Sequence, residues 1–338
     1  MPRPSFGGRQ CGGFIKGIGA VASWPLAARA QHPTGSALKM PRVGILAPSG
    51  SSSNLEAFDR GMQALGYIDG QNITIERRYG DPKGERLREL ASELAKLKVD
   101  VIGAWSTTVA LAAQQATSTI PIVAAVMADP VNDGLVASLA RPGGNITGTT
   151  FLGPELVAKR LQLFREVIPR LSRVAALWHP HAYGERTMAS MSKDAEASAQ
   201  KLGMQLQFVP AANPDELASA FSTIAEQRSE AFIVLPSPML FNQHKRIVAF
   251  AASNRLPAVY QAREFVDAGG LMSYGANLAE LSRSAALFVD KILKGAKPSE
   301  LPVEQPSRIE LVINLKTAKD LGLTFTREFL LIADEVVE

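Results

Sequence analysis

Cysteine is almost absent from this chain, since Cys11 is the only one among 338 residues. A single thiol excludes an internal disulfide, and it also excludes zinc sites built from several thiolates. Histidine is scarce as well, with four in the chain. His179 and His181 stand two residues apart, but the sequence places no third metal ligand beside them. We therefore expect neither a bound metal nor a cofactor.

Excess charge is missing once the first 30 residues are set aside. The formal net charge of the whole chain is +4. Arg3, Arg9, Lys16 and Arg29 account for all of it, because residues 1–30 contain no Asp or Glu. The neutral remainder lacks the basic surface with which proteins neutralise a phosphate backbone. This composition excludes nucleic acid as the expected partner.

Long hydrophobic runs are also absent, because no later stretch approaches the roughly 20 apolar residues of a membrane-spanning helix. Residues 17–28 form a shorter apolar run, which follows basic residues and leads into Ala28-Arg29-Ala30. A basic start, an apolar run and small residues in this order are typical of a secretory signal peptide. We expect residues 1–30 to be such a signal, cleaved after Ala30, and the protein to be periplasmic. The alternative is a disordered N-terminal tail.

From residue 41 onward, strand patterns alternate with amphipathic helix patterns. Strands are expected at 42–47, 72–79, 99–104, 122–126 and 145–151, and helices at 54–65, 85–98, 108–116 and 132–140. In the helix expected at 85–98, for example, leucines recur with helical spacing on one side. Strands that alternate with helices predict a parallel sheet with helices on both faces.

The same alternation then starts again. After a bridging helix at 155–168, strands are expected at 173–178, 205–209, 231–235, 258–261, 271–274 and 309–313. Helices are expected at 185–202, 215–226, 243–254, 278–293, 315–321 and 327–336. Both halves open on a similar apolar strand, at 42–48 and at 173–180. The sequence therefore predicts an α/β fold of two Rossmann-like lobes with parallel sheets.

A ligand of such a fold binds beyond the carboxyl ends of the strands. In the first half, the loop after residue 47 carries Ser49, Ser51 and Asn54 and leads into a helix N-terminus. Free backbone N–H groups there can bind an anion, although one Ser or Asn could equally serve as a plain helix cap. Trp105, with a ligand-stacking or core role, precedes two further polar residues after the third strand. Asp129, a ligand acceptor or a cap, follows the fourth strand.

The second half offers histidine, tyrosine, serine and arginine side chains at corresponding strand ends. Tyrosine rings can stack on a ligand ring, and arginine can pair with a carboxylate. Tyr274 could instead pack where the chain crosses between lobes. The candidate ligand-binding residues of both halves are Ser49, Ser51, Asn54, Trp105, Ser106, Thr107, Asp129, His179, Tyr183, Ser237, Tyr260, Arg263 and Tyr274.

Three separated motifs carry a resemblance to a known family. They are the run from Asp129-Pro130-Val131 to Arg141-Pro142-Gly143-Gly144-Asn145-Ile146-Thr147-Gly148, the run Gly269-Gly270-Leu271-Met272-Ser273-Tyr274-Gly275, and Leu301-Pro302-Val303-Glu304-Gln305-Pro306 followed by residues 310–318. The chain resembles the ABC-transporter substrate-binding proteins of the tryptophan/tyrosine-binding type over about residues 42–338.

The resemblance implies a type I periplasmic-binding-protein fold, in which two lobes joined by a three-crossover hinge close on a ligand. We expect lobe 1 at 41–152 plus 272–304 and lobe 2 at 153–271 plus 305–338. The resemblance also implies a small-molecule ligand, with aromatic or other amino acids the leading class. It further implies an ABC-transporter permease as a partner at the inner membrane. We expect a monomer without catalytic activity.

Two other functions remain open from the residues alone. An enzyme on this scaffold would need a nucleophile or an acid–base pair. The sequence has no Gly-x-Ser-x-Gly elbow, although His179 and Asp129 could pair across a cleft. A periplasmic ligand sensor for a receptor would use the same two lobes. Turnover of a substrate would identify the enzyme, and importer genes beside this one would favour transport.

Overall fold

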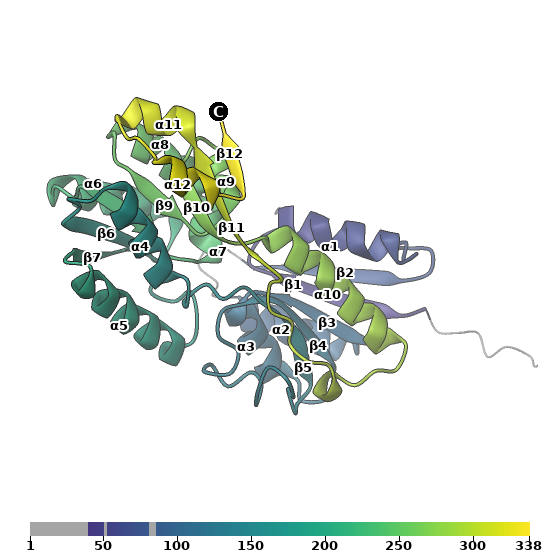
Figure 1. Cartoon of the computed structure of the whole chain (residues 1–338). Helices are drawn as coiled ribbons and strands as arrows, with labels where there is room; N and C mark the ends of the chain where they lie inside the picture. Colours follow the sequence, from purple (N-terminus) through teal and green to yellow (C-terminus); the bar gives the residue numbers. More distant parts are fainter. Residues whose placement is uncertain (1–39, 51–52, 81–85) are drawn as a thin grey trace, which may run out of the picture. The chain divides into compact units, whose positions relative to one another are not determined.

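A computed structural model describes residues 40–50, 53–80 and 86–338 of the protein (Figure 1). Outside these ranges lie the expected signal peptide, which contains Cys11 and ends at the cleavage site after Ala30, and the candidate residue Ser51. None of the helices within these ranges combines the length and the apolar character that crossing a bilayer requires.

The first sheet is built by the N-terminal half of the chain. Its strands are β1 (Arg42–Ala47), β2 (Thr74–Tyr79), β3 (Val101–Trp105), β4 (Ile122–Met127) and β5 (Ile146–Thr150). They pair in the order β2-β1-β3-β4-β5, and every pairing is parallel. The carboxyl ends of these strands therefore lie at one edge of the sheet, as the alternating pattern predicted.

Helices cover both faces of this sheet (Figure 1). Val43, Ile45 and Ala47 of β1 pack with α1 (Ser53–Ala64) and α10 (Leu278–Leu293). Leu46 points to the opposite face and packs with α2 (Leu87–Lys96) and α3 (Thr107–Ala116). Successive strand residues alternate between faces, so burial on both sides requires the nearly continuous apolar strands seen in the sequence.

The second sheet is built by the C-terminal half. Its strands are β6 (Arg173–Trp178), β7 (Gln205–Pro210), β8 (Ala231–Val234), β9 (Ala258–Tyr260), β10 (Met272–Ala276), β11 (Ile309–Asn314) and β12 (Glu335–Val337). Their order is β12-β11-β10-β9-β8-β6-β7, with β10 and β11 antiparallel and the other pairings parallel. Its helices are α4 (Val157–Val167), α5 (Glu185–Lys201), α6 (Leu217–Glu226), α7 (Pro238–Asn242), α8 (His244–Ser253), α9 (Arg263–Asp267), α11 (Leu315–Leu321) and α12 (Arg327–Leu331).

Some expected elements are wrong. The segment 132–140 is not a helix, because Gly134 takes a left-handed φ of 73° and the next two residues donate their backbone N–H groups to the Pro130 carbonyl. The helix expected over 327–336 ends at Leu331, and β12 follows it. The helices α7 and α9 were not expected, because five residues are too few to show a helical period.

The strand β10 lies in the second sheet, where it pairs with β9 and β11. The sequence suggested that residues 272–304 accompany the first lobe, whereas residues 272–276 do not. The helix α10, which begins at Leu278, is the part that packs on the first sheet. The chain therefore returns to the first sheet between Ala276 and Leu278.

Within the described residues, the chain passes between the two sheets three times: after β5, after β10 and before β11. The first and last passages run together, since Thr150 donates its backbone N–H to the Glu304 carbonyl at 2.9 Å. The buried Arg160 of α4 donates from Nε to the Tyr274 carbonyl at 2.7 Å and from Nη1 to the Gly153 carbonyl at 3.2 Å. One guanidinium thus connects the first passage with β10, the strand that leads into the second.

Candidate functional site

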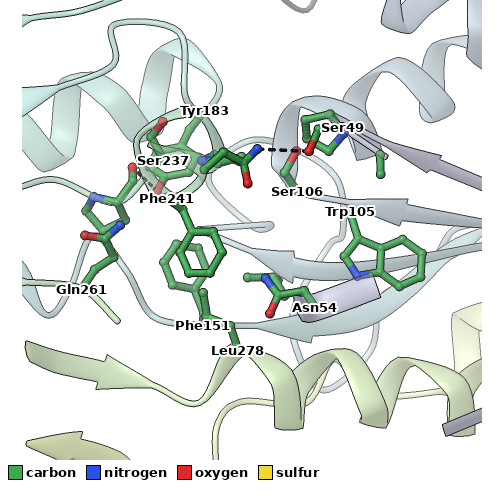
Figure 2. A pocket seen from close by; sticks show the side chains of 16 residues that line it. Ser49, Asn54, Trp105, Ser106, Phe151, Tyr183, Ser237, Phe241, Gln261 and Leu278 are labelled. Atoms are coloured by element: carbon green, nitrogen blue, oxygen red, sulfur yellow. Dashed lines mark hydrogen bonds between the residues drawn. The ribbon is translucent and has the colours of Figure 1, made fainter. Parts of the chain in front are cut away.

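A pocket opens where strand ends of both sheets meet (Figure 2). Its empty space, open mouth included, is about 670 Å³. The pocket is lined by Ala47, Pro48, Ser49, Asn54, Trp105, Ser106, Val126, Phe151, Tyr183, Pro236, Ser237, Pro238, Phe241, Asn242, Gln261 and Leu278. Among these described lining residues, none carries a formal charge. Binding here relies on dipoles, ring faces and hydrogen bonds.

One wall of the pocket belongs to the first sheet. Ser49 follows β1, and Asn54 lies in the first turn of α1. Trp105 ends β3, and Ser106 follows it. Ser106 is the N-cap of α3, and its Oγ accepts the backbone N–H of Val109 at 3.4 Å. The first turns of α1 and α3 thus lie at this wall, where the positive ends of the two helix dipoles favour a negatively charged group.

The backbone is strained at two residues of this wall. Ser106 has φ 109° and Val126 has φ 59°, values that residues with a Cβ rarely adopt. Each such conformation costs about 1–3 kcal/mol and persists only where its surroundings fix it. Val126 is held because its N–H donates to Thr149 Oγ1 at 3.0 Å, beside an irregularity in the pairing of β4 with β5. Two of the six non-glycine residues with positive φ in the described part of the chain thus line this pocket, and strain at such positions is typical of functional sites.

Several polar atoms in the pocket have no hydrogen-bond partner among the described residues. They are Asn54 Oδ1, Trp105 Nε1, and both amide atoms of Gln261. Trp105 is 5% exposed and Gln261 is 4% exposed, so bulk water does not satisfy these atoms. A buried donor or acceptor without a partner costs about 1–3 kcal/mol. These atoms therefore fit a ligand that supplies both donors and acceptors.

Rings and aliphatic side chains occupy the space between these polar groups. Phe151 comes from the first passage between the sheets, Phe241 from α7 and Leu278 from the first turn of α10. Tyr183 packs near Phe151, with ring centroids 6.4 Å apart, and donates its hydroxyl to the Pro236 carbonyl at 2.6 Å. Burial raises the pKa of Tyr183 far above its usual range, so this phenol stays neutral. The middle of the pocket therefore suits an apolar or aromatic group.

Direct hydrogen bonds also join elements of the two sheets, and two of them are relevant to the pocket. Asn242 of α7 donates from Nδ2 to Ser49 Oγ at 3.1 Å, the bond drawn dashed in Figure 2. The second contact is made by Asp133, whose Oδ2 accepts the Gly184 backbone N–H at 3.3 Å at the start of α5. Burial raises the pKa of Asp133 above its usual value, and this effect outweighs its hydrogen bonds. Both contacts depend on the lobes being together.

His179 does not line this pocket and lies instead in a larger neighbouring cavity, together with His181 and His244. Its Nδ1 is 3.4 Å from Ser237 Oγ. Burial, and then the nearby His181, lower the pKa of His179 to about 4, so its imidazole is neutral at physiological pH. No group of three or more His, Cys, Asp or Glu side chains positioned for a metal ion occurs among the described residues.

Six of the candidate residues come together in the pocket: Ser49, Asn54, Trp105, Ser106, Tyr183 and Ser237. Ser237 is the N-cap of the five-residue helix α7, where its Oγ accepts the backbone N–H of Leu240. The candidates Thr107, Asp129, His179, Tyr260, Arg263 and Tyr274 do not line it.

These other candidates have structural partners. Thr107 Oγ1 accepts the Ala128 N–H at 2.9 Å, and Asp129 Oδ1 accepts the Asn132 N–H at 3.0 Å. Tyr260 is fully buried and stacks on Phe265 in the core of the second sheet. Arg263 binds Asp267 and Glu335 at the surface instead of a ligand carboxylate. Tyr274 lies within β10, packs against the core of the second sheet, and accepts from Arg160 through its backbone carbonyl.

The pocket also contains residues that the sequence did not single out, chiefly Gln261, Asn242, Phe241 and Phe151. Gln261 directly follows β9, so its position at a strand end was a usable signal. Phe151 had the same signal, because it ends the strand expected at 145–151, whereas Phe241 and Asn242 had none because they lie on an unexpected helix.

Comparison with known proteins gives a consistent result. The family model for ABC transporter substrate binding proteins matches residues 45–337. A curated tyrosine-binding protein of Clostridioides difficile is 27% identical over 270 residues, which cover 79% of this chain and 76% of that protein.

Solved structures show the same fold. A conserved domain protein of Vibrio cholerae has a TM-score of 0.78 and 27% identity, with 88% of this chain and all of that chain covered. An ABC domain from Streptococcus pneumonia, solved with L-Trp, has a TM-score of 0.77 and 24% identity, with 87% of this chain and all of that chain covered. The expected type I periplasmic-binding-protein fold is thereby confirmed.

Proposed function

The chain belongs to the family of ABC transporter substrate-binding proteins, and we propose that its ligand is an aromatic amino acid held in the pocket between the two sheets. One observation carries this proposal. The described lining residues carry no charge, and they place rings beside buried polar atoms that lack partners in the described part of the chain. The tyrosine-binding relative and the L-Trp complex support the same ligand class.

The amino acid group fits the wall formed by the first sheet. A carboxylate there would meet the first turns of α1 and α3 and the indole N–H of Trp105. The ammonium would donate to Asn54 Oδ1, an acceptor with no other partner among the described residues. Because no carboxylate lines the described pocket, the ligand's own two charges should balance each other. A zwitterion meets this requirement better than a simple cation or anion.

Ligand capture would work by closure of the lobes. We infer that lobe 1 comprises the first sheet with α10, and lobe 2 the second sheet, joined by the three passages of chain. A ligand that touches both walls stabilises the closed form only through its higher affinity for that form. The contacts of Asn242 with Ser49 and of Asp133 with Gly184 would form on closure.

The cellular setting follows from the family and the sequence. A substrate-binding protein delivers its ligand to an ABC transporter permease, and proteins of this family act outside the cytoplasm. We infer that residues 1–30 direct export, that the mature protein acts as a periplasmic monomer, and that it has no catalytic role. Expression of the full chain with N-terminal sequencing of the periplasmic product tests the signal peptide. Mass spectrometry of the ligand after incubation tests the absence of turnover.

The ligand proposal is tested by thermal unfolding of the purified protein against the twenty amino acids. A ligand at 100 times its dissociation constant should stabilise the protein by about 2.7 kcal/mol. Tyr, Trp or both should raise the melting temperature, whereas Lys, Asp and Glu should not, because among the described lining residues none carries a charge. An unchanged melting temperature with every aromatic amino acid would disprove the ligand class, while leaving family membership untouched.

A further inference from the structure

Gln261 lies in the pocket with its whole side-chain amide unused. Both Nε2 and Oε1 are buried without a hydrogen-bond partner in the described part of the chain, and the residue is 4% exposed. An amide offers two N–H donors and an oxygen with two lone pairs. A single buried residue thus presents donors and acceptors together, and no described group of the protein forms a hydrogen bond with them.

The backbone around Gln261 is tightly fixed. Tyr260 before it is fully buried and stacks on Phe265 at a centroid distance of 4.6 Å. A Cβ added at Gly275 of β10 would lie 1.9 Å from the Gln261 carbonyl oxygen, so only glycine lets this strand pass so close. The amide therefore projects into the pocket from a rigid base, which is what a selective contact requires.

The position of Gln261 separates it from the wall assigned to the amino acid group. In Figure 2, Gln261 and Trp105 stand at opposite ends of the labelled side chains, and the rings of Phe151 and Phe241 lie between them in this view. Gln261 follows β9 of the second sheet, whereas Trp105 and Asn54 belong to the first-sheet side. The longer helices also begin at the first-sheet wall, since α1 and α3 have 12 and 10 residues, whereas the helices beginning near Gln261 and Ser237 have five each. This difference favours the first-sheet wall for the charged amino acid group.

From this arrangement we propose that Gln261 is the specificity-determining residue that binds the polar group at the far end of the ligand's ring. The inference rests on the proposed function, because it takes the amino acid group to lie at the first-sheet wall. The phenol of tyrosine can donate to Oε1 and accept from Nε2, so it satisfies both ends of the amide. The indole N–H of tryptophan satisfies Oε1 alone, and phenylalanine satisfies neither. The expected order of affinity is therefore Tyr, then Trp, then Phe.

The size of the preference follows from the cost of leaving a buried amide unpaired. Phenylalanine would enclose the Gln261 amide without a partner, so its affinity should be about 10- to 100-fold below that of tyrosine. Trp105 Nε1 and Asn54 Oδ1 do not discriminate among the three ligands, because all three carry the same amino acid group.

The test measures the dissociation constants of Tyr, Trp and Phe by calorimetry for the wild type, Gln261→Met and Asn54→Leu. Gln261→Met keeps the length of the side chain and removes the amide, so Tyr should lose most of its advantage while Phe binds as well or better. Asn54→Leu is the matched control on the opposite wall, and it should weaken all three ligands by a similar factor. Gln261→Leu repeats the test if the methionine variant folds poorly.

The outcomes separate the two proposals. Equal affinities of Tyr and Phe for the wild type, or an equal loss of both in Gln261→Met, would overturn the role of Gln261 while leaving aromatic ligands in place. Absence of binding by any of the three would overturn the ligand class as well. A difference between Tyr and Phe that collapses in Gln261→Met and survives in Asn54→Leu supports the assignment.

Discussion

Replacing Asp133 should weaken ligand binding, although Asp133 does not line the pocket. Asp133 lies in the segment between β4 and β5 of the first sheet. Its carboxylate accepts the backbone N–H of Gly184, which directly precedes α5 in the second half of the fold. Gly184 is the N-cap residue of α5, so a side chain of the other lobe satisfies an N–H at this helix terminus. If the lobes separate when the ligand leaves, this contact exists only in the closed form, and it adds to the apparent affinity without touching the ligand.

The magnitude follows from known capping energies. Exchange of a capping side chain for alanine costs about 0.5–2 kcal/mol. Asp133→Ala should therefore raise the dissociation constant by about 2- to 30-fold. Asp133→Asn keeps an acceptor for the Gly184 N–H without the charge that burial disfavours, so its affinity at neutral pH should equal or exceed that of the wild type. Calorimetric titration with the ligand found in the amino acid screen measures all three proteins.

Gly184→Ala tests the same contact by changing the residue that donates the hydrogen bond. A Cβ at position 184 would lie 2.3 Å from Asp133 Oδ1, so the alanine and the carboxylate cannot occupy their present positions together. The backbone of Gly184, with φ −65° and ψ 157°, is one that alanine adopts without strain. The variant should therefore fold normally and bind less tightly. Its combination with Asp133→Ala should cost less than the sum of the two, because the collision disappears.

The pH dependence has a defined sign. Burial raises the pKa of Asp133, so the protonated carboxyl is favoured in this conformation. The corresponding stabilisation is present at pH values below the ordinary pKa and is lost as the pH rises through the raised pKa. Acidification should thus favour closure in the wild type more than in Asp133→Asn, which has no proton to bind. Unchanged affinity in both Asp133→Ala and Gly184→Ala would refute the idea that this contact closes the lobes.

Three further predictions concern stability. Ser106→Ala should lower the free energy of unfolding in urea by about 1 kcal/mol through loss of the α3 cap. Ser106→Gly should lower it less or raise it, because glycine relieves the φ of 109°; equal losses in both would contradict the strain argument. Arg160→Leu should cost about 2–4 kcal/mol, because two buried carbonyls at the lobe passages lose their donor; a wild-type unfolding curve would disprove this role. The pKa of His179, lowered to about 4, predicts stability that is complete above about pH 6.5 and lost as the pH falls towards 4. His179→Asn should reduce that loss by up to about 3 kcal/mol in denaturant unfolding at the two pH values.

Most of the fold could be predicted because parallel strands that are buried on both faces leave a strong pattern. The strands β1 and β6 and the helix α10 occupy the residues expected for them. Errors arose where a local conformation overrides the apolar pattern. Gly134 turns the chain where leucine and valine spacing suggested a helix, and β12 takes residues that continue the pattern of α12. Propensity over a short segment is a weak signal, and contacts distant in sequence decide the outcome.

The site was partly predictable for a reason of topology. The carboxyl ends of parallel strands share one edge, so Trp105 and Ser106 could be placed near a ligand from the sequence alone. Tyr183 and Ser237 of the opposite lobe follow strands and could also be named, but the side chains of α7 could not be placed, because their position depends on how the lobes meet. Asn242, which bonds to Ser49 across 193 residues of sequence, is an example.

Backbone strain at the pocket explains why the remaining features escape sequence reasoning. Ser106 and Val126 hold positive φ angles without being glycine, so their residue types do not predict these backbone conformations. Glycine at position 106 would adopt this φ angle with less strain, but it has no hydroxyl with which to cap α3 beside the pocket. A strained serine retained at the N-terminus of α3 is consistent with a hydroxyl that serves both the cap and the ligand. The residues that fit their local conformation worst are thus among those that define the pocket.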